Sequence, residues 1–520
     1  MALAKKAQSF AEKIAMNGPG AIEAEPAQKL RARTVSGVSW SVFSQVLKQG
    51  FTFAISLVVA RILGPSIYGL VGMVTVFTNF AALFSELGFG PAIIQRKELE
   101  PKHLNAAFWS TVVTGLLLTL LMAGLSPVIA KFYDKPVLAP LSAVVALQFL
   151  LSACNVVQIA LLTRQMRFRQ LAFIDVTATV VAGTLGLCMA LRGAGPWSLV
   201  AQSLTNAFIS VVLAWITSNW RPSFGFQISA CRDLLKFSGY LVGFNIVNYW
   251  ARNLDALLVG RVIGATALGF YTRAYSLMLL PLSQVSFILG KVMFPALSSI
   301  QHDKERVKRA YLKAISLIAF VTFPMMIGLF VVSDSFINAL LGAKWTGAIP
   351  LLKIFCWVGL LQSITTTLGW VTTSQGRTKL YFYMGATNAC ACGISFVIGL
   401  HWGTSGVAIS YAVCNLIMWY PTWRICGNVI GLTFTEMTRN VARTFFCAAG
   451  MGAGIGVIEW ALAAAVPAWL RLAIIVPLGV GLYLAIASLV RLDSWKLAKE
   501  VIHERLGKFT AIGARFAREN

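Results

Sequence analysis

The stretch from Val38 to Gly69 reads VSWSVFSQVLKQGFTFAISLVVARILGPSIYG and combines a long apolar segment with a turn motif. Its apolar length predicts a membrane-spanning helix, and the glycine- and proline-containing segment after Arg61 predicts a tight turn. The middle of this helix carries Gln45, Lys48 and Gln49, where an ordinary span would be apolar. A central lysine costs about 3 kcal/mol on insertion scales, so we expect Lys48 to face protein or water rather than lipid.

The composition extends this prediction to the whole chain. Of the 520 residues, 57% are apolar and only 12% are charged, which excludes an ordinary soluble domain and predicts an all-α polytopic membrane protein. The net charge of +25 is explained by loops that collect lysine and arginine on one side of a membrane. We expect no nucleic-acid partner, because the chain has no soluble basic domain.

Apolar segments of about 20 residues predict fourteen transmembrane helices. The connections that would lie on the inner side, together with both tails, hold about 32 of the 44 basic residues, against roughly seven in the outer connections. This asymmetry predicts that both termini are cytoplasmic. The predicted spans are 36–60, 66–88, 104–127, 137–162, 171–191, 197–217, 235–260, 266–290, 312–333, 348–370, 380–400, 404–423, 441–461 and 468–490.

An internal repeat organises these helices. The motif from Arg61 to Gly69 aligns with the motif from Arg261 to Gly269 at an offset of 200, with the arginine and both glycines matched. We therefore expect two parallel six-helix lobes around a central cavity, an arrangement that places substrate between the halves of a transporter. The predicted segments are a cytoplasmic tail over 1–34, a first lobe over 35–220, a cytoplasmic linker over 221–234, a second lobe over 235–425, two further helices over 438–490 and a basic amphipathic cytoplasmic tail over 491–520.

Polar residues on the lead helix of each half form the candidate binding site. On the first of these helices Lys48 is the best candidate, and its neighbours extend a polar surface. On these helices and the eighth and tenth, the charged groups are four cations and one acid, namely Lys48, Arg252, Arg273 and Lys353 against Asp255. A cavity with that balance attracts anions, and guanidinium groups suit phosphate oxygens. The candidate substrate-binding residues are Lys48, Gln45, Gln49, Thr52, Asn245, Asn248, Arg252 and Arg273.

Other interpretations of the polar residues stay open at this stage. Asp255 and Arg273 lie at similar depth, which suits a structural ion pair, and Asn245 and Asn248 suit hydrogen bonds between helices. The side chain of Lys353 is long enough to extend its charged end to the outer membrane interface. A further group is expected to belong to networks at the inner helix ends, and includes Glu86 and Asp175. Asp255 and Glu86 are also candidates for coupling to protons or sodium, although no coupling-ion motif is present.

Cysteine and histidine give no sign of a metal site. The nine cysteines lie mostly inside apolar spans without a CxxC pair, and the four histidines are scattered. We therefore expect no disulfide framework, no metal and no other cofactor.

Five segments together resemble the multidrug/oligosaccharidyl-lipid/polysaccharide exporter superfamily, and within it the polysaccharide transporter branch of Wzx-type flippases in its exopolysaccharide, colanic-acid-like subgroup. The similarity extends over about residues 35–425. The segments are ARILGPSIYGLVGMV from Ala60, SELGFGPAIIQRKEL from Ser85, LNAAFW from Leu104, LLKFSGY from Leu234 and ALGFYTRAYSL from Ala267.

The resemblance implies a flippase of the bacterial inner membrane that works by alternating access. Its substrates would be undecaprenyl-pyrophosphate-linked oligosaccharide units for exopolysaccharide or lipopolysaccharide, and its partners a polymerase and export machinery. Cavity cations are thought to hold the diphosphate in such proteins, and Lys48 and Arg252 match that role. Flippases of the peptidoglycan precursor lipid II share these features and stay an alternative, as does another exporter of this superfamily. A polymerase or ligase enzyme is disfavoured, because the outer loops are short and lack paired acids.

Overall fold

The computed structural model describes residues 45, 47–85, 89–96, 99–223, 239–496 and 499. The predicted N-terminal tail, most of the predicted linker, nearly all of the basic tail after Lys496 and the side chain of Glu86 lie outside these residues. The chain divides into two compact units, one made of Met1–Leu63 with Leu70–Trp250 and the other of Gly64–Gly69 with Ala251–Asn520.

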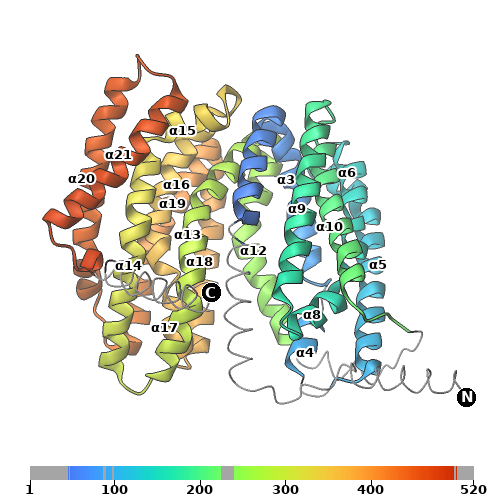
Figure 1. Ribbon diagram of the computed structural model, residues 1–520. Coiled ribbons are helices and arrows are strands. Elements are labelled where there is room, and N and C mark those ends of the chain that lie inside the picture. The colour runs from blue at the N-terminus through green and yellow to red at the C-terminus, as the bar shows by residue number, and fades with distance from the viewer. Residues whose placement is uncertain are drawn as a thin grey trace, which may run out of the picture. The chain divides into compact units, whose positions relative to one another are not determined.

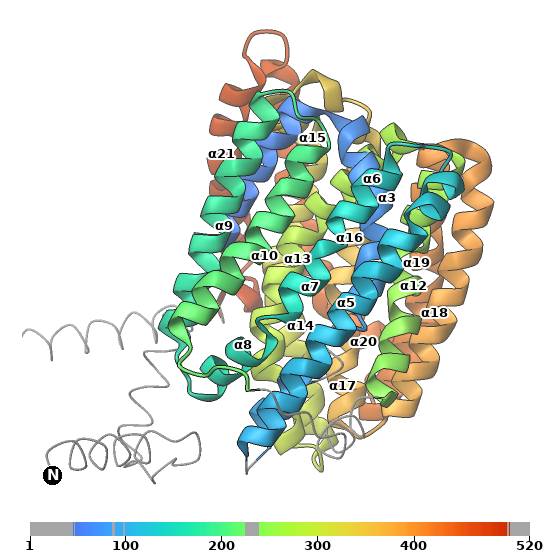
Figure 2. The same cartoon turned by 90° about the vertical axis from the view of Figure 1, so that its right-hand side faces the viewer.

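The first unit is built from helices that pack side by side. α9 runs along α10, α4 lies against α8, and α6, α7 and α8 follow one another along α5 (Figure 2). The helices are a first helix over residues 47–63, α3 (Pro65–Ala82) from Leu70 onward, α4 (Phe89–Gln95), α5 (Pro101–Phe132), α6 (Leu138–Val145), α7 (Leu147–Ala153), α8 (Val156–Arg164), α9 (Phe168–Leu191), α10 (Trp197–Thr217) and the first half of α12 (Gly239–Val262).

The second unit holds the remaining helices. α20 packs along α14, and α21 packs on α20 and α15, so the last two long helices belong to this unit (Figure 1). After the second half of α12, the helices are α13 (Ala265–Ser299), α14 (Lys304–Val331), α15 (Ser333–Leu340), α16 (Ala348–Thr365), α17 (Leu368–Ser374), α18 (Thr378–Gly399), α19 (Gly403–Gly427), α20 (Phe434–Leu462) and α21 (Ala468–Leu489).

The predicted all-α membrane architecture is confirmed. Each of the fourteen predicted spans contains a helix within the described residues. Nine helical segments there are long and apolar enough to cross a membrane, or ten if the bent pair Leu138–Ala153 and Val156–Arg164 is one span. One of the nine, Thr378–Ile430, contains both α18 and α19. α12 is not among them because it carries polar side chains such as Asn248, Arg252 and Asp255.

The repeated motif forms a close crossing of two helix starts within the second unit. Gly64 and Gly264, just before α3 and α13, have φ of +79° and +112°, values that favour glycine. A Cβ atom on Gly69 would lie 1.7 Å from the carbonyl oxygen of Ala265, and one on Gly269 would lie 2.0 Å from that of Pro65. The two contacts are reciprocal, so the paired glycines of the repeat let the two backbones touch.

We expect Gly69→Ala and Gly269→Ala each to lower the free energy of unfolding by about 2 kcal/mol or more, because a methyl group there overlaps backbone oxygen. Thermal unfolding of the purified protein in detergent measures this loss. Gly124→Ala in α5 is the matched control, since a Cβ atom there meets nothing within 4 Å. An unchanged melting temperature for both motif variants would contradict the crossing.

Candidate functional site

Lys48 forms an ion pair inside the first unit. Its Nζ lies 3.4 Å from Oδ1 of Asp175 on α9, and the two side chains are 35% and 58% exposed. The partner of Asp175, which we expected in a network at the inner helix ends, is thus a lysine of the first helix. Pairs this exposed contribute about 0–1 kcal/mol, so an anionic ligand can replace the carboxylate at little cost.

A polar cavity of about 600 Å³ opens beside Lys48, and all of its lining residues belong to the first unit. We call it the first-unit polar cavity. Ten of its thirteen lining residues are polar, and they come from the first helix, α7, α9, α10 and the connection between α7 and α8. The polar residues are Lys48, Thr52, Gln148, Ser152, Asn155, Thr179, Gln202, Ser203, Asn206 and Ser210.

Most of these residues were not predicted, although the sequence holds a signal for them. Gln202, Asn206 and Ser210 lie at i, i+4 and i+8 on α10, so they share one helix face. Of the predicted residues, Lys48 and Thr52 line the cavity, whereas Gln45 and Gln49 are not among its lining residues.

Three side-chain amides in the cavity have open hydrogen-bonding capacity. Gln148, Gln202 and Asn206 are half-buried, and the structure gives them no hydrogen bond to another described residue. In contrast, Asn155 Nδ2 donates to Ser210 Oγ at 3.0 Å. Each open amide offers two donor hydrogens and an acceptor oxygen to whatever fills the cavity.

The cavity is bordered by a broken helix. α7 ends at Ala153 and α8 begins at Val156, with a bend of 40° between Leu138–Ala153 and Val156–Arg164. Side chains from neighbouring helices donate to carbonyl oxygens along the interrupted segment. Trp215 Nε1 donates to Cys154 O at 2.8 Å. The Thr119 hydroxyl is shared between Ala146 O at 3.0 Å and Gly115 O of its own helix at 2.8 Å, and the Thr111 hydroxyl between Ala153 O at 3.3 Å and Phe108 O at 2.9 Å. Breaks at membrane depth are tolerated where such partners exist, and they mark binding sites in transporters.

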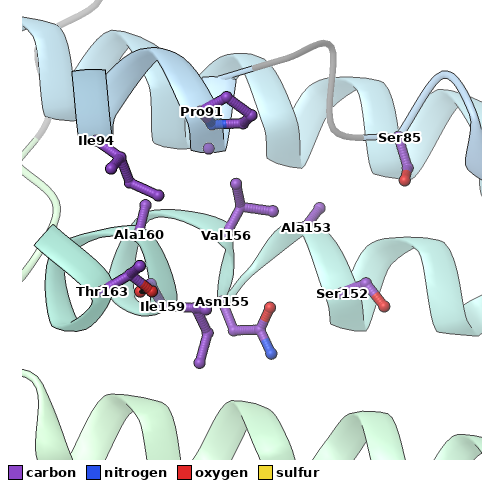
Figure 3. A pocket seen from close by; sticks show the side chains of 11 residues that line it. Ser85, Pro91, Ile94, Ser152, Ala153, Asn155, Val156, Ile159, Ala160 and Thr163 are labelled. Atoms are coloured by element: carbon purple, nitrogen blue, oxygen red, sulfur yellow. Dashed lines mark hydrogen bonds between the residues drawn. The ribbon is translucent and has the colours of Figure 1, made fainter. Parts of the chain in front are cut away.

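A second cavity of about 360 Å³ lies on the α4 side of this break and shares Ser152 and Asn155 with the first. Figure 3 shows Ala153 and Val156 pointing toward α4, with Asn155 on the opposite side of the chain. The break therefore places Asn155 between two hollows of the first unit.

In the second unit, Arg252 is exposed and the described residues provide no ion pair for it. Asp255 is only 7% exposed, and it accepts from the hydroxyl of Tyr271 at 2.9 Å and the backbone N–H of Ala256 at 2.7 Å. The guanidinium carbon of Arg273 lies 5.7 Å from the centroid of the Tyr68 ring. The alternative of an ion pair between Asp255 and Arg273 is therefore wrong.

The expected balance of four cations to one acid also needs correction. Lys48 pairs with Asp175, and Lys353 Nζ lies 2.6 Å from Oδ2 of Asp334. Two of the four cations thus have a carboxylate that the sequence pattern did not assign to them. Asn248 is exposed, while the side chains of Asn245 and Glu86 lie outside the described part of the chain.

We expect Thr119→Val and Trp215→Phe each to lower the free energy of unfolding by about 0.5–2 kcal/mol, because each removes a side-chain donor to a carbonyl oxygen of the interrupted segment. Thermal unfolding in detergent measures the change. Thr184→Val is the control, since in the described part of the chain its hydroxyl donates to Val180 O of the same helix and to no other group. Losses no larger than that of the control would show that these bonds do not support the break.

Comparison with known proteins places the chain among sugar-polymer biosynthesis proteins. It is 30% identical over 379 residues to the teichuronic acid biosynthesis protein TuaB of Bacillus subtilis, which covers 72% of this chain and 78% of that one. It is 28% identical to the lipopolysaccharide biosynthesis protein WzxC of Escherichia coli, over 75% and 80% of the two chains. It is 26% identical to the succinoglycan biosynthesis transport protein ExoT of Rhizobium meliloti, over 70% and 74%.

Solved structures show the same fold. The inward closed conformation of the lipid II flippase MurJ superposes with a TM-score of 0.70 at 15% identity, over 88% of this chain and 99% of that one. At that identity the similarity concerns the fold alone. The model of the family described as "Polysaccharide biosynthesis protein" matches residues 58–350, which is more than half of the chain, and the chain therefore belongs to this family.

Proposed function

We propose that this chain flips undecaprenyl-pyrophosphate-linked oligosaccharide units from the cytoplasmic to the periplasmic leaflet of the bacterial inner membrane. The observation that carries the proposal is Lys48, whose exposed counterion is replaceable, beside a polar cavity in a membrane-spanning unit. The similarity to a protein named for succinoglycan biosynthesis transport supports transport rather than an enzymatic step. The polymer would be an exopolysaccharide or lipopolysaccharide, and a polymerase would take up the flipped unit.

Lys48 and Arg252 would hold the diphosphate of the substrate. Each phosphate of the diphosphate carries a negative charge, whereas Asp175 offers Lys48 a single exposed carboxylate, so the diphosphate would displace Asp175 from Lys48. Arg252 offers a planar guanidinium that binds phosphate oxygens with two hydrogen bonds. The polyprenyl tail would stay in the bilayer while the lobes rock. Both termini would be cytoplasmic, because the basic residues collect in the tails and the inner connections.

Lipid II is the second candidate substrate, because a lipid II flippase shares the fold. The sequence similarity favours the first candidate, since the relatives at 26–30% identity are named for teichuronic acid, lipopolysaccharide and succinoglycan.

We expect Lys48→Ala and Arg252→Ala to abolish polymer export, because each removes a cation that would hold the diphosphate. Polymer yield and the accumulation of lipid-linked oligosaccharide in the inner leaflet measure this in a strain lacking the native gene. Asp175→Asn should keep export, because Lys48 remains.

The control is Lys353→Ala, since Lys353 also has a carboxylate partner and a similar exposure, 37% against 35%. Normal export by Lys48→Ala would remove Lys48 from the mechanism. Accumulation of the oligosaccharide in the outer leaflet of cells lacking this protein would instead indicate a polymerase.

The coupling of transport to protons or sodium through Asp255 stays a prediction. Its partners are a tyrosine hydroxyl and a backbone N–H, so its negative charge has no cation beside it among the described residues. A buried carboxylate in that setting favours binding a proton or a cation.

We expect Asp255→Asn to keep substrate binding but to lose the dependence of flipping on an ion gradient across proteoliposomes. Unchanged gradient dependence would exclude this role.

A further inference from the structure

We propose that the first-unit polar cavity binds the saccharide part of the lipid-linked substrate through the side-chain amides of Gln148, Gln202 and Asn206. The inference rests on the proposed function and deepens it, because it assigns separate residues to the sugar and to the diphosphate. The sugar would lie in the cavity while Lys48, which lines the same cavity, holds the phosphate to which the sugar is linked.

The open hydrogen-bonding capacity of these amides is the first support. In a membrane protein, polar groups without partners cost free energy unless water or a polar ligand satisfies them. The cavity collects three such amides, and the structure gives none of them a hydrogen bond to another described residue. Their donors and acceptors are therefore available to a ligand that can replace water there.

The chemical class of the ligand follows from what lines the cavity. Lys48 is its one cationic lining residue, and no acidic residue is among the thirteen that line it. A second phosphate group or a cationic drug would find no complementary charge there, and a lipid chain would meet polar side chains from ten of the thirteen lining residues. Saccharide hydroxyl groups both donate and accept hydrogen bonds, as amides and hydroxyl side chains do. A neutral, hydroxyl-rich ligand fits this wall best.

The size and position of the cavity agree with a sugar next to a diphosphate. Its volume of about 600 Å³ falls within the range of small-molecule sites. Thr52 lies one helical turn after Lys48 and also lines the cavity, so the cation and the neutral wall are continuous. This order matches the covalent order of the substrate, in which the diphosphate carries the first sugar.

Local packing holds the amides in place. A Cβ atom on Gly186 of α9 would lie 2.9 Å from Cβ and 3.2 Å from Oε1 of Gln202, so the glycine makes room for this side chain. The bond from Asn155 to Ser210 connects the helix break to the α10 face that carries Gln202 and Asn206. A site supported in this way is ordered before the ligand arrives.

The test measures binding to the full-length protein in lipid nanodiscs with two probes. One probe is undecaprenyl diphosphate without sugar, and the other is the lipid-linked oligosaccharide extracted from cells that lack this protein. We expect the double variant Gln202→Leu/Asn206→Leu to bind the oligosaccharide probe about tenfold more weakly, since two hydrogen-bonding side chains are lost. Its affinity for undecaprenyl diphosphate should stay within about twofold. Lys48→Ala should weaken binding of both probes.

Two further variants keep the test decisive. Gly186→Ala should weaken binding of the oligosaccharide probe in the same selective way, because it displaces Gln202 while every polar side chain remains. Thr184 on α9 is not among the residues that line the cavity. The Thr184→Val variant should therefore bind both probes as the unmodified protein does.

The outcomes separate the two hypotheses. Equal weakening of both probes by the double variant, or no weakening of either, would overturn the saccharide site and leave the proposed function standing. Failure of the unmodified protein to bind either probe would overturn the proposed function, and the saccharide site with it.

Discussion

The need to satisfy backbone polar groups away from water governs the first unit of this protein. A membrane-spanning segment can be interrupted only where other groups replace the missing helical hydrogen bonds. Thr111, Thr119 and Trp215 supply such donors around the breaks on either side of α7. These bonds let the chain bend beside Asn155 and expose polar side chains inside the unit. The polar cavity therefore depends on residues that line no part of it.

Electrostatics in the site are weaker than a count of charges indicates. Lys48 and Lys353 each have a nearby carboxylate, and both pairs are more than one-third exposed. Exposed pairs of this kind exchange partners readily, because water and the protein compensate the charges almost equally well. A transporter benefits from such pairs, since a substrate must be bound and then released. The neutral amides beside Lys48 add selectivity without adding charge.

Much of the architecture was predictable from the sequence, and the reason is the membrane. Apolar length and loop charge act locally, so the spans could be placed one by one, and each contains a helix in the described residues. The repeated glycine motif was visible as well, although its purpose was not. Only the structure shows that Gly69 and Gly269 make reciprocal contacts with Ala265 and Pro65.

The helices, the repeat and the choice of Lys48 as a candidate site residue followed from the sequence alone, because a lysine inside an apolar span is costly wherever it lies. Its partner Asp175 is 127 residues away and the polar α10 face still further, so no local pattern connects them. The partners of Asp255 and Arg273 were also beyond the sequence, since the depth of a residue in a span does not define the direction of its side chain. Tertiary packing alone decided which polar residues meet, because those contacts depend on how neighbouring helices are rotated about their axes.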